Sequence, residues 1–198
     1  MTRLTRAESQ QRTRALIVDA ATDLFLRAGF QVTSLEQIGE EAGFTRGAVY
    51  SNFPSKTAMG IAVIDELYDR EGDRLEAALD ATENLDDWFD ALAAWADGTI
   101  GEPRWTRLEI ELAAFSAHDD VYRAATAARY ADMRKRWAAL FAARFSGTFP
   151  MDPDAVGAII IALGLGTGVQ RAVDPDLPGS DWVELLRTLV GSVTAGVT

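Results

Sequence analysis

The stretch from Ser34 to Lys56, SLEQIGEEAGFTRGAVYSNFPSK, limits what this chain can fold into more than any other. It predicts two short helices joined by a tight turn. Ser34 and Gln37 have the spacing of a capping box, so the first helix is expected to begin there. Gly43 can adopt the left-handed conformation that ends a helix, and Thr45 can cap a second helix directly afterwards.

The second helix, from Arg46 to about Phe53, is too short and too poor in apolar residues to be stable alone. Val49 and Phe53 are expected to be buried, which leaves most of its other side chains for contacts outside the helix. Two short helices of this kind are typical of a helix-turn-helix, whose second helix enters the major groove of DNA.

At these residues the chain resembles a known family. The run GFTRGAVYSNFPSK resembles the recognition helix and following turn of the TetR family of bacterial transcriptional repressors, and TSLEQIGEEAG resembles that family's preceding helix. The resemblance is strong over residues 10–60 and general beyond them. It implies an all-α fold of nine helices, with a three-helix DNA-binding head at 1–55 and a ligand-binding and dimerisation body at 56–198. It also implies a homodimer that binds an operator in double-stranded DNA and responds to a small-molecule effector.

Arg46 is the best candidate for a base contact, because a guanidinium can fork onto guanine in the major groove. Lys56 lies in the first turn of the next helix, where the helix dipole disfavours a cation unless an anion is near. A DNA phosphate would be that anion, although an ordinary solvated lysine is the alternative. The candidate DNA-binding residues are Ser34, Thr45, Arg46, Gly47, Ala48, Tyr50, Ser51, Asn52 and Lys56.

The charge distribution favours DNA binding at the N-terminal end. The chain has a net charge of −11, yet residues 1–56 carry a net +1, and four arginines lie within residues 1–14. Attraction to phosphate falls off within about 8 Å at physiological salt, so local charge matters more than the total. The acidic remainder would orient this end toward DNA, or would serve only to keep the protein soluble. Residues 1–9 are expected to be a disordered basic arm.

Composition excludes several kinds of chemistry. The chain has no cysteine and one histidine, His118, so disulfides, thiolate metal sites and mechanisms that need two histidines are excluded. Neither a catalytic site nor a cofactor nor a metal is expected. The N-terminus carries no apolar signal segment, and the longest apolar run, 155–169, is broken by glycines and shorter than the ~20 residues of a membrane span. The expected location is the cytoplasm, with no membrane partner.

Helical periodicity continues through the rest of the chain, and no segment alternates like a strand. A first helix is expected from about Gln10 to Ala28, with Leu16 on its apolar stripe, and a long fourth helix from Lys56 to about residue 81. Five more helices are expected to begin near residues 86, 103, 119, 154 and 181, with Phe115 on the apolar stripe of the sixth.

Aromatic residues concentrate in the body, where the default interpretation is a packed core. A cleft lined by aromatic rings and a few polar groups is also what a ligand site looks like. A carboxylate one turn from Trp105 would suit an apolar or aromatic effector that carries a positive charge. The candidate ligand-binding residues are Trp88, Trp95, Trp105, Glu109, Tyr130 and Trp137.

The last two helices carry more apolar surface than a single chain of this length needs to expose, so a dimer is expected there. Gly164, Gly166 and Gly168 lie in a helical pattern with no preceding strand, which favours close packing against a partner helix over a phosphate-binding loop. The candidate dimerisation residues are Val156, Ile159, Ile160, Leu163, Gly164, Leu186, Leu189 and Val190.

Two other classes of function remain open on the sequence. One is an architectural DNA-binding protein without an effector. The other is a helical small-molecule-binding protein or enzyme whose N-terminal part only resembles a repressor.

Overall fold

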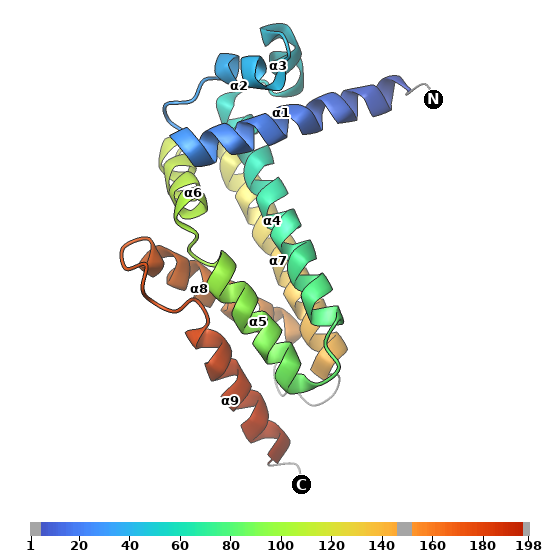
Figure 1. Cartoon of the computed structure of the whole chain (residues 1–198), viewed down its shortest axis with the longest axis vertical. Helices are drawn as coiled ribbons and strands as arrows, with labels where there is room; N and C mark the ends of the chain where they lie inside the picture. The colour runs from blue at the N-terminus through green and yellow to red at the C-terminus, as the bar shows by residue number, and fades with distance from the viewer. Residues whose placement is uncertain (1–4, 146–151, 196–198) are drawn as a thin grey trace. The chain divides into compact units, whose positions relative to one another are not determined.

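The computed structural model describes residues 5–145 and 152–195. Within these ranges the chain forms nine α-helices and no strand (Figure 1), which confirms the predicted all-α fold. The helices are α1 Arg6–Ala28, α2 Leu35–Ala42, α3 Arg46–Asn52, α4 Lys56–Asp80, α5 Leu85–Thr99, α6 Pro103–Phe115, α7 Asp120–Phe145, α8 Pro153–Arg171 and α9 Asp181–Ala195.

Helix α1 begins at Arg6, earlier than the sequence analysis predicts. Thr5 accepts a hydrogen bond from the Glu8 N–H, and the Glu8 carboxylate accepts one from the Thr5 N–H at 2.7 Å, so the two form a capping box. The hydrogen bond from the Thr5 backbone, and after it a side-chain hydrogen bond with Thr5, lower the pKa of the Glu8 carboxyl. The expectation of a disordered arm is therefore wrong for residues 6–9, and residues 1–4 lie outside the described part of the chain.

The chain divides into two compact units, and the division differs from the expected boundary at residues 55 and 56. The first unit comprises the chain up to Leu67 together with Arg107–Ala125. The second comprises Tyr68–Thr106 together with the chain from Thr126 onward. The first turns of α4 and most of α6 thus pack with α1–α3, so the unit that holds the helix-turn-helix is larger than the predicted head.

The core of the first unit joins α1–α3 to α4 and α6. Phe25 and Phe30 pack edge to face with ring centroids 5.1 Å apart. A Cβ on Gly60 of α4 would lie 2.8 Å from the Leu112 side chain of α6, so a larger residue at this position would force that side chain to move. The large, fully buried side chains of this unit are Ile17, Phe25, Phe30, Ile38, Phe53, Met59, Ile64, Leu108 and Leu112.

Two residues that were expected on apolar stripes are instead exposed. Leu16 is 45% exposed and Phe115 is 55% exposed. Each lies at the edge of its helix's buried face, where periodicity alone does not separate core from boundary positions. Phe115 still packs edge to face against Phe30 at 5.3 Å.

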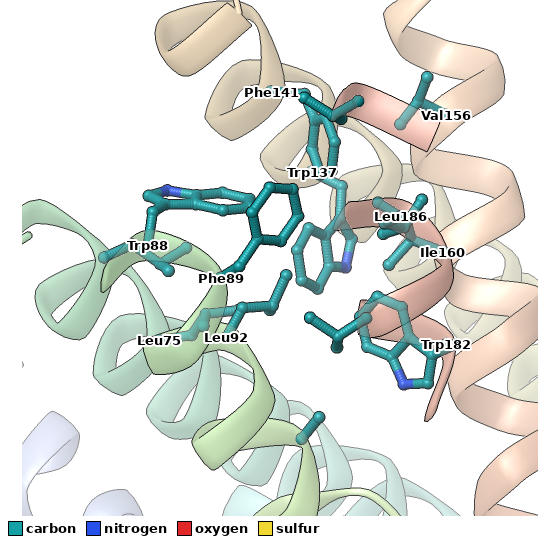
Figure 2. Close-up of a cluster of buried hydrophobic side chains, with 14 of the residues drawn as sticks. Leu75, Trp88, Phe89, Leu92, Trp137, Phe141, Val156, Ile160, Trp182 and Leu186 are labelled. Carbon is teal, nitrogen blue, oxygen red and sulfur yellow. The ribbon is translucent and has the colours of Figure 1, made fainter. Parts of the chain in front are cut away.

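The core of the second unit combines aromatic side chains of α5, α7 and α9 with aliphatic side chains that include residues of α4 and α8 (Figure 2). Trp88 meets Phe89, Phe141 and Phe145 edge to face, at centroid distances of 5.2, 5.6 and 5.5 Å. Trp137 lies 6.1 Å from Trp95 and 6.4 Å from Trp182. Edge-to-face pairs add about 0.5–1.5 kcal/mol each to the burial of the rings, so this cluster is a major source of the unit's stability.

An arginine connects α7 to the acidic face of α4 within the second unit. Arg136 contacts Asp73 at 2.8 Å and Glu76 at 2.7 Å, and the hydrogen bond to Glu76 is the main cause that raises the pKa of its guanidinium. The guanidinium lies over Gly72, where a Cβ would come within 2.6 Å of it.

The sequence analysis expects the glycines of α8 to pack closely against a second copy of the chain. Some of them pack instead against residues of the same chain. A Cβ on Gly168 would meet the backbone of Gly101, and one on Gly164 would meet the Ile100 side chain at 3.6 Å. A Cβ on Gly166 has no described atom within 4 Å. The closest approach is at Gly157, where a Cβ would lie 2.7 Å from the backbone oxygen of Arg134.

We therefore expect Gly157→Ala to destabilise the protein by about 1–3 kcal/mol, because a rigid backbone must move to accommodate the methyl group. Urea unfolding followed by circular dichroism measures this change. Gly98→Ala on α5 is the matched control: its Cβ has open space, so helix propensity predicts a gain of up to about 1 kcal/mol. Equal stability of Gly157→Ala and wild type would contradict the close approach of α8 to α7.

Candidate nucleic-acid interface

Helices α2 and α3 form the turn that the sequence predicts. Ser34 accepts a hydrogen bond from the Gln37 N–H, and the Gln37 side chain accepts one from the Ser34 N–H. Gly43 ends α2 with φ of 73°, a left-handed conformation that favours glycine. Thr45 then caps α3 by accepting from the Ala48 N–H at 3.3 Å.

The two helices pack closely because of a glycine that the sequence analysis overlooked. A Cβ on Gly39 of α2 would lie 3.0 Å from the Val49 side chain and 3.1 Å from the Phe44 carbonyl oxygen. Val49 and Phe53 are buried, as predicted, and they fix α3 to the rest of the unit.

One face of α3 is exposed. Thr45, Arg46, Gly47, Tyr50 and Ser51 are exposed. A Cβ at Gly47 would meet only the Thr45 hydroxyl, at 3.9 Å, among the described atoms, so another molecule can come close to the helix backbone there.

The remaining candidates on α3 are held by the helix itself. Ala48 and Asn52 are partly buried. The side chains of Ser51 and Asn52 both donate to the Ala48 carbonyl, at 2.9 and 2.8 Å. Arg14 of α1 donates to the Asn52 carbonyl at 3.1 Å and lies over the Phe53 ring, so an arginine of the basic N-terminal segment is fixed beside the end of α3.

Arg46 and Tyr50 share a partner on α2. The Arg46 Nε lies 3.1 Å from Oε1 of Glu36, and the Tyr50 hydroxyl donates to the same oxygen at 3.3 Å. The Arg46 guanidinium also lies 5.2 Å from the centre of the Tyr50 ring. The three side chains form one connected group between the two helices, in which Arg46 and Tyr50 are exposed and Glu36 is partly buried.

A hollow of about 370 Å³ lies beside this group. It is lined by the loop Gln31–Ser34, the first residues of α2, Tyr50, Ser55 and Lys56. The hydroxyls of Ser34 and Ser55 accept from Gln37 N–H and Ala58 N–H, so each still has its own hydrogen to donate. Free N–H groups and hydroxyls at two helix N-termini favour an anion, and a phosphate group fits that chemistry.

Lys56 does not extend freely into solvent. Its ammonium donates to the Gln31 carbonyl at 2.8 Å and lies 4.7 Å from the centre of the Phe30 ring. Partial burial lowers the pKa of Lys56, and the charge of Glu111 partly offsets this effect. A phosphate in the hollow would meet this ammonium at its wall.

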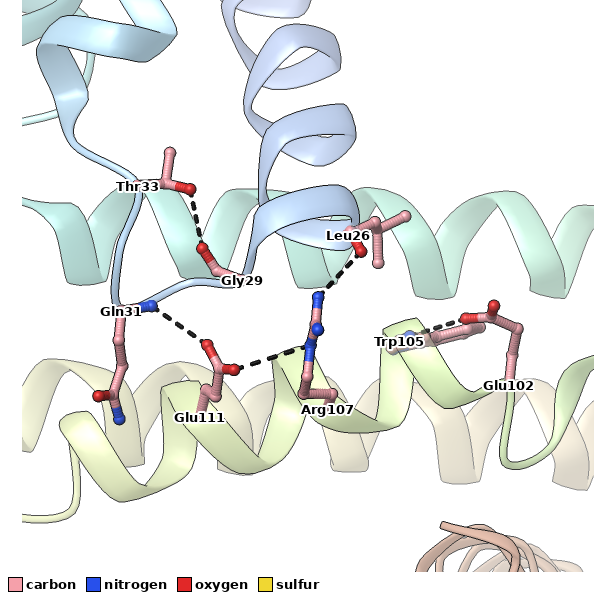
Figure 3. Close-up of polar contacts among 8 residues, drawn as sticks. All are labelled: Leu26, Gly29, Gln31, Thr33, Glu102, Trp105, Arg107 and Glu111. Carbon is pink, nitrogen blue, oxygen red and sulfur yellow. Dashed lines mark hydrogen bonds and ion pairs between the residues drawn. The ribbon is translucent and has the colours of Figure 1, made fainter. Parts of the chain in front are cut away.

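Helix α6 contributes two residues that sequence reasoning did not assign to this unit (Figure 3). Arg107 donates to the Leu26 carbonyl at 3.1 Å, and the Glu111 carboxylate accepts from the Gln31 N–H at 3.1 Å and lies 3.7 Å from the Arg107 Nε. Gly29, with φ of 108°, lies against Glu111. The α1–α2 loop that borders the hollow is therefore held by α6.

The residues proposed for an effector site are divided by the structure. Trp88 and Trp137 are 3% and 8% exposed and belong to the packed core, which is the default interpretation. Trp95, Trp105 and Tyr130 are partly buried. Among the described residues, the indole N–H groups of Trp95 and Trp105 are buried without a hydrogen-bond acceptor.

Glu109 belongs to the first unit, whereas Trp105 and the other four candidates belong to the second. The rings nearest Trp105 include one that the sequence analysis did not select. Tyr68 packs edge to face against Trp105 at 5.0 Å, and the Arg129 guanidinium lies 5.7 Å from the Tyr68 ring centre.

The proposed dimerisation residues also separate into two groups. Val156, Ile160, Leu186 and Val190 are buried in the chain's own core, so their assignment to a surface between copies is corrected. Both faces of α8 are apolar, and periodicity could not tell which one faces inward. Ile159 and Leu189 are exposed, and Leu163 and Gly164 are partly buried. Two further residues that the sequence analysis missed, Val169 and Leu185, are also exposed.

By length and composition alone, one helix of the described residues, α8, could cross a membrane.

The fold and this interface define a class: an all-α protein with an N-terminal helix-turn-helix. Residues 17–63 match the family model described as bacterial regulatory proteins, tetR family. Over these residues the chain is similar to the DNA-binding domain of the tetR family.

Known proteins similar to this chain agree with that family. ArpR of Pseudomonas putida, a probable HTH-type transcriptional regulator, is 40% identical over 86 residues, which are 43% of this chain and 40% of ArpR. The chain thus matches about 40% of the length of this curated relative.

Solved structures extend the likeness to nearly the whole fold. A transcriptional regulator from Rhodococcus sp. RHA1 superposes with a TM-score of 0.72 at 19% identity, over 93% of this chain and 94% of the other. NalD of Pseudomonas aeruginosa, the secondary repressor of the MexAB-OprM multidrug efflux pump, gives a TM-score of 0.56 at 25% identity, over 94% and 97% of the two chains.

Proposed function

We propose that this protein is a ligand-responsive transcriptional regulator, a repressor that binds a palindromic operator through α3. The observation that carries the proposal is the division of α3 into a buried side, Val49 and Phe53, and an exposed side with Arg46, Gly47 and Tyr50. That arrangement offers a guanidinium and a close-approaching backbone to the floor of a major groove.

The hollow beside α3 supports a backbone contact next to the base contact. Ser34, Ser55 and Lys56 line it, and all three present donors to one space. Phosphate contacts of this kind fix the register of a helix-turn-helix on DNA while the α3 side chains read the bases. The protein would act in the cytoplasm of a bacterium, where its DNA partner lies.

A second copy of the chain is the partner we propose for α8 and α9. Ile159, Val169, Leu185 and Leu189 expose large apolar side chains on these two helices. Two apolar helix faces that pack against their copies would bury them, and a two-fold dimer matches a palindromic operator.

We place the effector in the second unit, near the partly buried indoles of Trp95 and Trp105. An unpaired buried N–H costs about 1–3 kcal/mol, so a bound molecule with an acceptor oxygen or nitrogen would gain by meeting one. Apolar or aromatic molecules suit the surrounding rings. Arg129 already places a cation over Tyr68, which makes a positively charged effector less suited to that end of the unit.

The experiment that tests the function is a gel shift with DNA that flanks the protein's own gene, repeated with a panel of small aromatic compounds. We expect a discrete shifted band that competitor DNA of random sequence does not remove, and at least one compound that releases it. Binding to every duplex without release would indicate an architectural protein. No retention of DNA even at low salt would indicate a helical small-molecule-binding protein or enzyme.

A further inference from the structure

Glu36 places a negative charge where the proposed interface needs positive ones. Its carboxylate lines the hollow that we assign to a DNA phosphate, and it lies in the first turn of α2, where the helix dipole stabilises an anion. It also holds both Arg46 and Tyr50 through a single oxygen, Oε1, at 3.1 and 3.3 Å.

These contacts have two opposite consequences for DNA binding. They hold the Arg46 guanidinium and the Tyr50 ring in one arrangement, 5.2 Å apart, before DNA arrives. They also neutralise the charge of Arg46 and leave a carboxylate close to any phosphate that enters the hollow. Like charges brought together at an interface lower the affinity for incorrect partners.

We propose that Glu36 is a specificity-determining residue, which lowers the affinity for DNA in general more than the affinity for the operator. On random DNA, Arg46 finds no matched guanine and stays paired with Glu36, so its charge is not available to a phosphate. On the operator, Arg46 exchanges the exposed contact with Glu36 for a bidentate contact with a base. This inference rests on the proposed function, because it assumes that α3 reads an operator.

The salt dependence of binding measures this role directly. Each phosphate contact contributes a slope of about −0.9 to a plot of log affinity against log salt. Removal of the Glu36 charge changes the net charge of the Arg46–Glu36 pair from zero to +1, so Arg46 can bind one more phosphate of random DNA. The slope on random DNA should then steepen by about 0.9, which at 0.1 M salt is about an eightfold gain in affinity.

The test uses the full-length chain and the variant Glu36→Gln, whose amide oxygen can still accept from Arg46 and Tyr50. Two labelled duplexes serve as probes: a 30-bp duplex of random sequence, and an operator selected by the wild-type protein from a random library. Fluorescence anisotropy gives the affinity for each at several salt concentrations. The matched control is Glu41→Gln, which removes the same charge from an exposed position on another face of α2.

We expect Glu36→Gln to bind the random duplex about eightfold more tightly than wild type at 0.1 M salt, with a steeper salt slope. We expect its affinity for the operator to change less than threefold, so that the ratio of specific to non-specific binding falls. Glu41→Gln should resemble wild type on both duplexes.

Equal slopes and equal specificity ratios for the two glutamine variants would overturn the inference while leaving the proposed function intact. A wild-type protein that selects no operator and does not bind the random duplex would contradict both. A fall in operator affinity with an unchanged random-duplex slope would show that Glu36 only positions Arg46 and Tyr50, and would also overturn the specificity role.

Discussion

Replacement of Arg46 or Tyr50 with alanine is expected to abolish specific retention of the operator while leaving helicity and assembly unchanged. Both side chains are exposed on α3, and the packing of that helix depends on Val49 and Phe53 instead. Loss of one bidentate base contact costs about 1–3 kcal/mol, and the loss occurs in each half of a symmetric site. A gel shift with the selected operator measures the effect, and circular dichroism checks the fold.

Lys135→Ala is the matched control for charge. Lys135 is an exposed cation on α7 that pairs with Asp132 at 3.1 Å, within the second unit. Its removal should leave operator affinity within about twofold of wild type, as is usual for an exposed pair. Wild-type operator affinity in both Arg46→Ala and Tyr50→Ala would show that the recognition face is assigned wrongly.

The double variant Ile159→Glu, Leu189→Glu is expected to give a folded monomer that no longer retains the operator. Both side chains are exposed on the helices that we propose as the dimer surface, so the changes should cost the single chain little. In the dimer they would place four carboxylates in an apolar interface, where buried unpaired charge is strongly unfavourable. Loss of the second half-site contact removes an avidity of about 10²–10⁴-fold.

Analytical ultracentrifugation and the gel shift together check this result. Val121→Glu provides the control, because Val121 is an exposed apolar residue on the part of α7 that belongs to the first unit. It should remain dimeric and bind DNA normally. A wild-type protein that sediments as a monomer at micromolar concentration would contradict the proposed dimer.

Sequence patterns predicted those features of the fold that depend on hydrogen bonds between residues a few positions apart. The Ser34–Gln37 capping box, the left-handed Gly43 and the cap at Thr45 each act within a few residues, and each has the predicted geometry. The same reasoning would have found the capping box of Thr5 and Glu8, which was overlooked because the basic composition of the segment suggested disorder.

Long-range contacts could not be predicted in this way. Glu111 binds the Gln31 N–H and Arg107 binds the Leu26 carbonyl, across separations of 80 and 81 residues. No periodicity within α6 indicates which distant backbone groups its charged residues will meet. The first compact unit differs in extent from the expected head for the same reason, since it includes Arg107–Ala125, which comprises most of α6.

The faces of α8 and α9 illustrate a different limit. Val156 and Ile159 are three positions apart on an apolar helix, yet one is 4% exposed and the other 44%. Hydrophobicity identifies helices of this kind as candidates for an interface, but it does not show which face is buried within the chain and which face is exposed. The pair of Glu36 with Arg46 was missed because the sequence analysis assigned Arg46 to a base contact and gave Glu36 no role.

The most direct test of the central claim is a hydroxyl-radical footprint of the protein on the operator that it selects from a random library. We predict two protected segments related by inverted symmetry, with half-site centres about one helical turn of DNA, or a multiple of it, apart. The base contacts within them should disappear in Arg46→Ala. A footprint without two-fold symmetry, or uniform protection of any duplex offered, would contradict the reading of α3 as the recognition helix of a two-fold regulator.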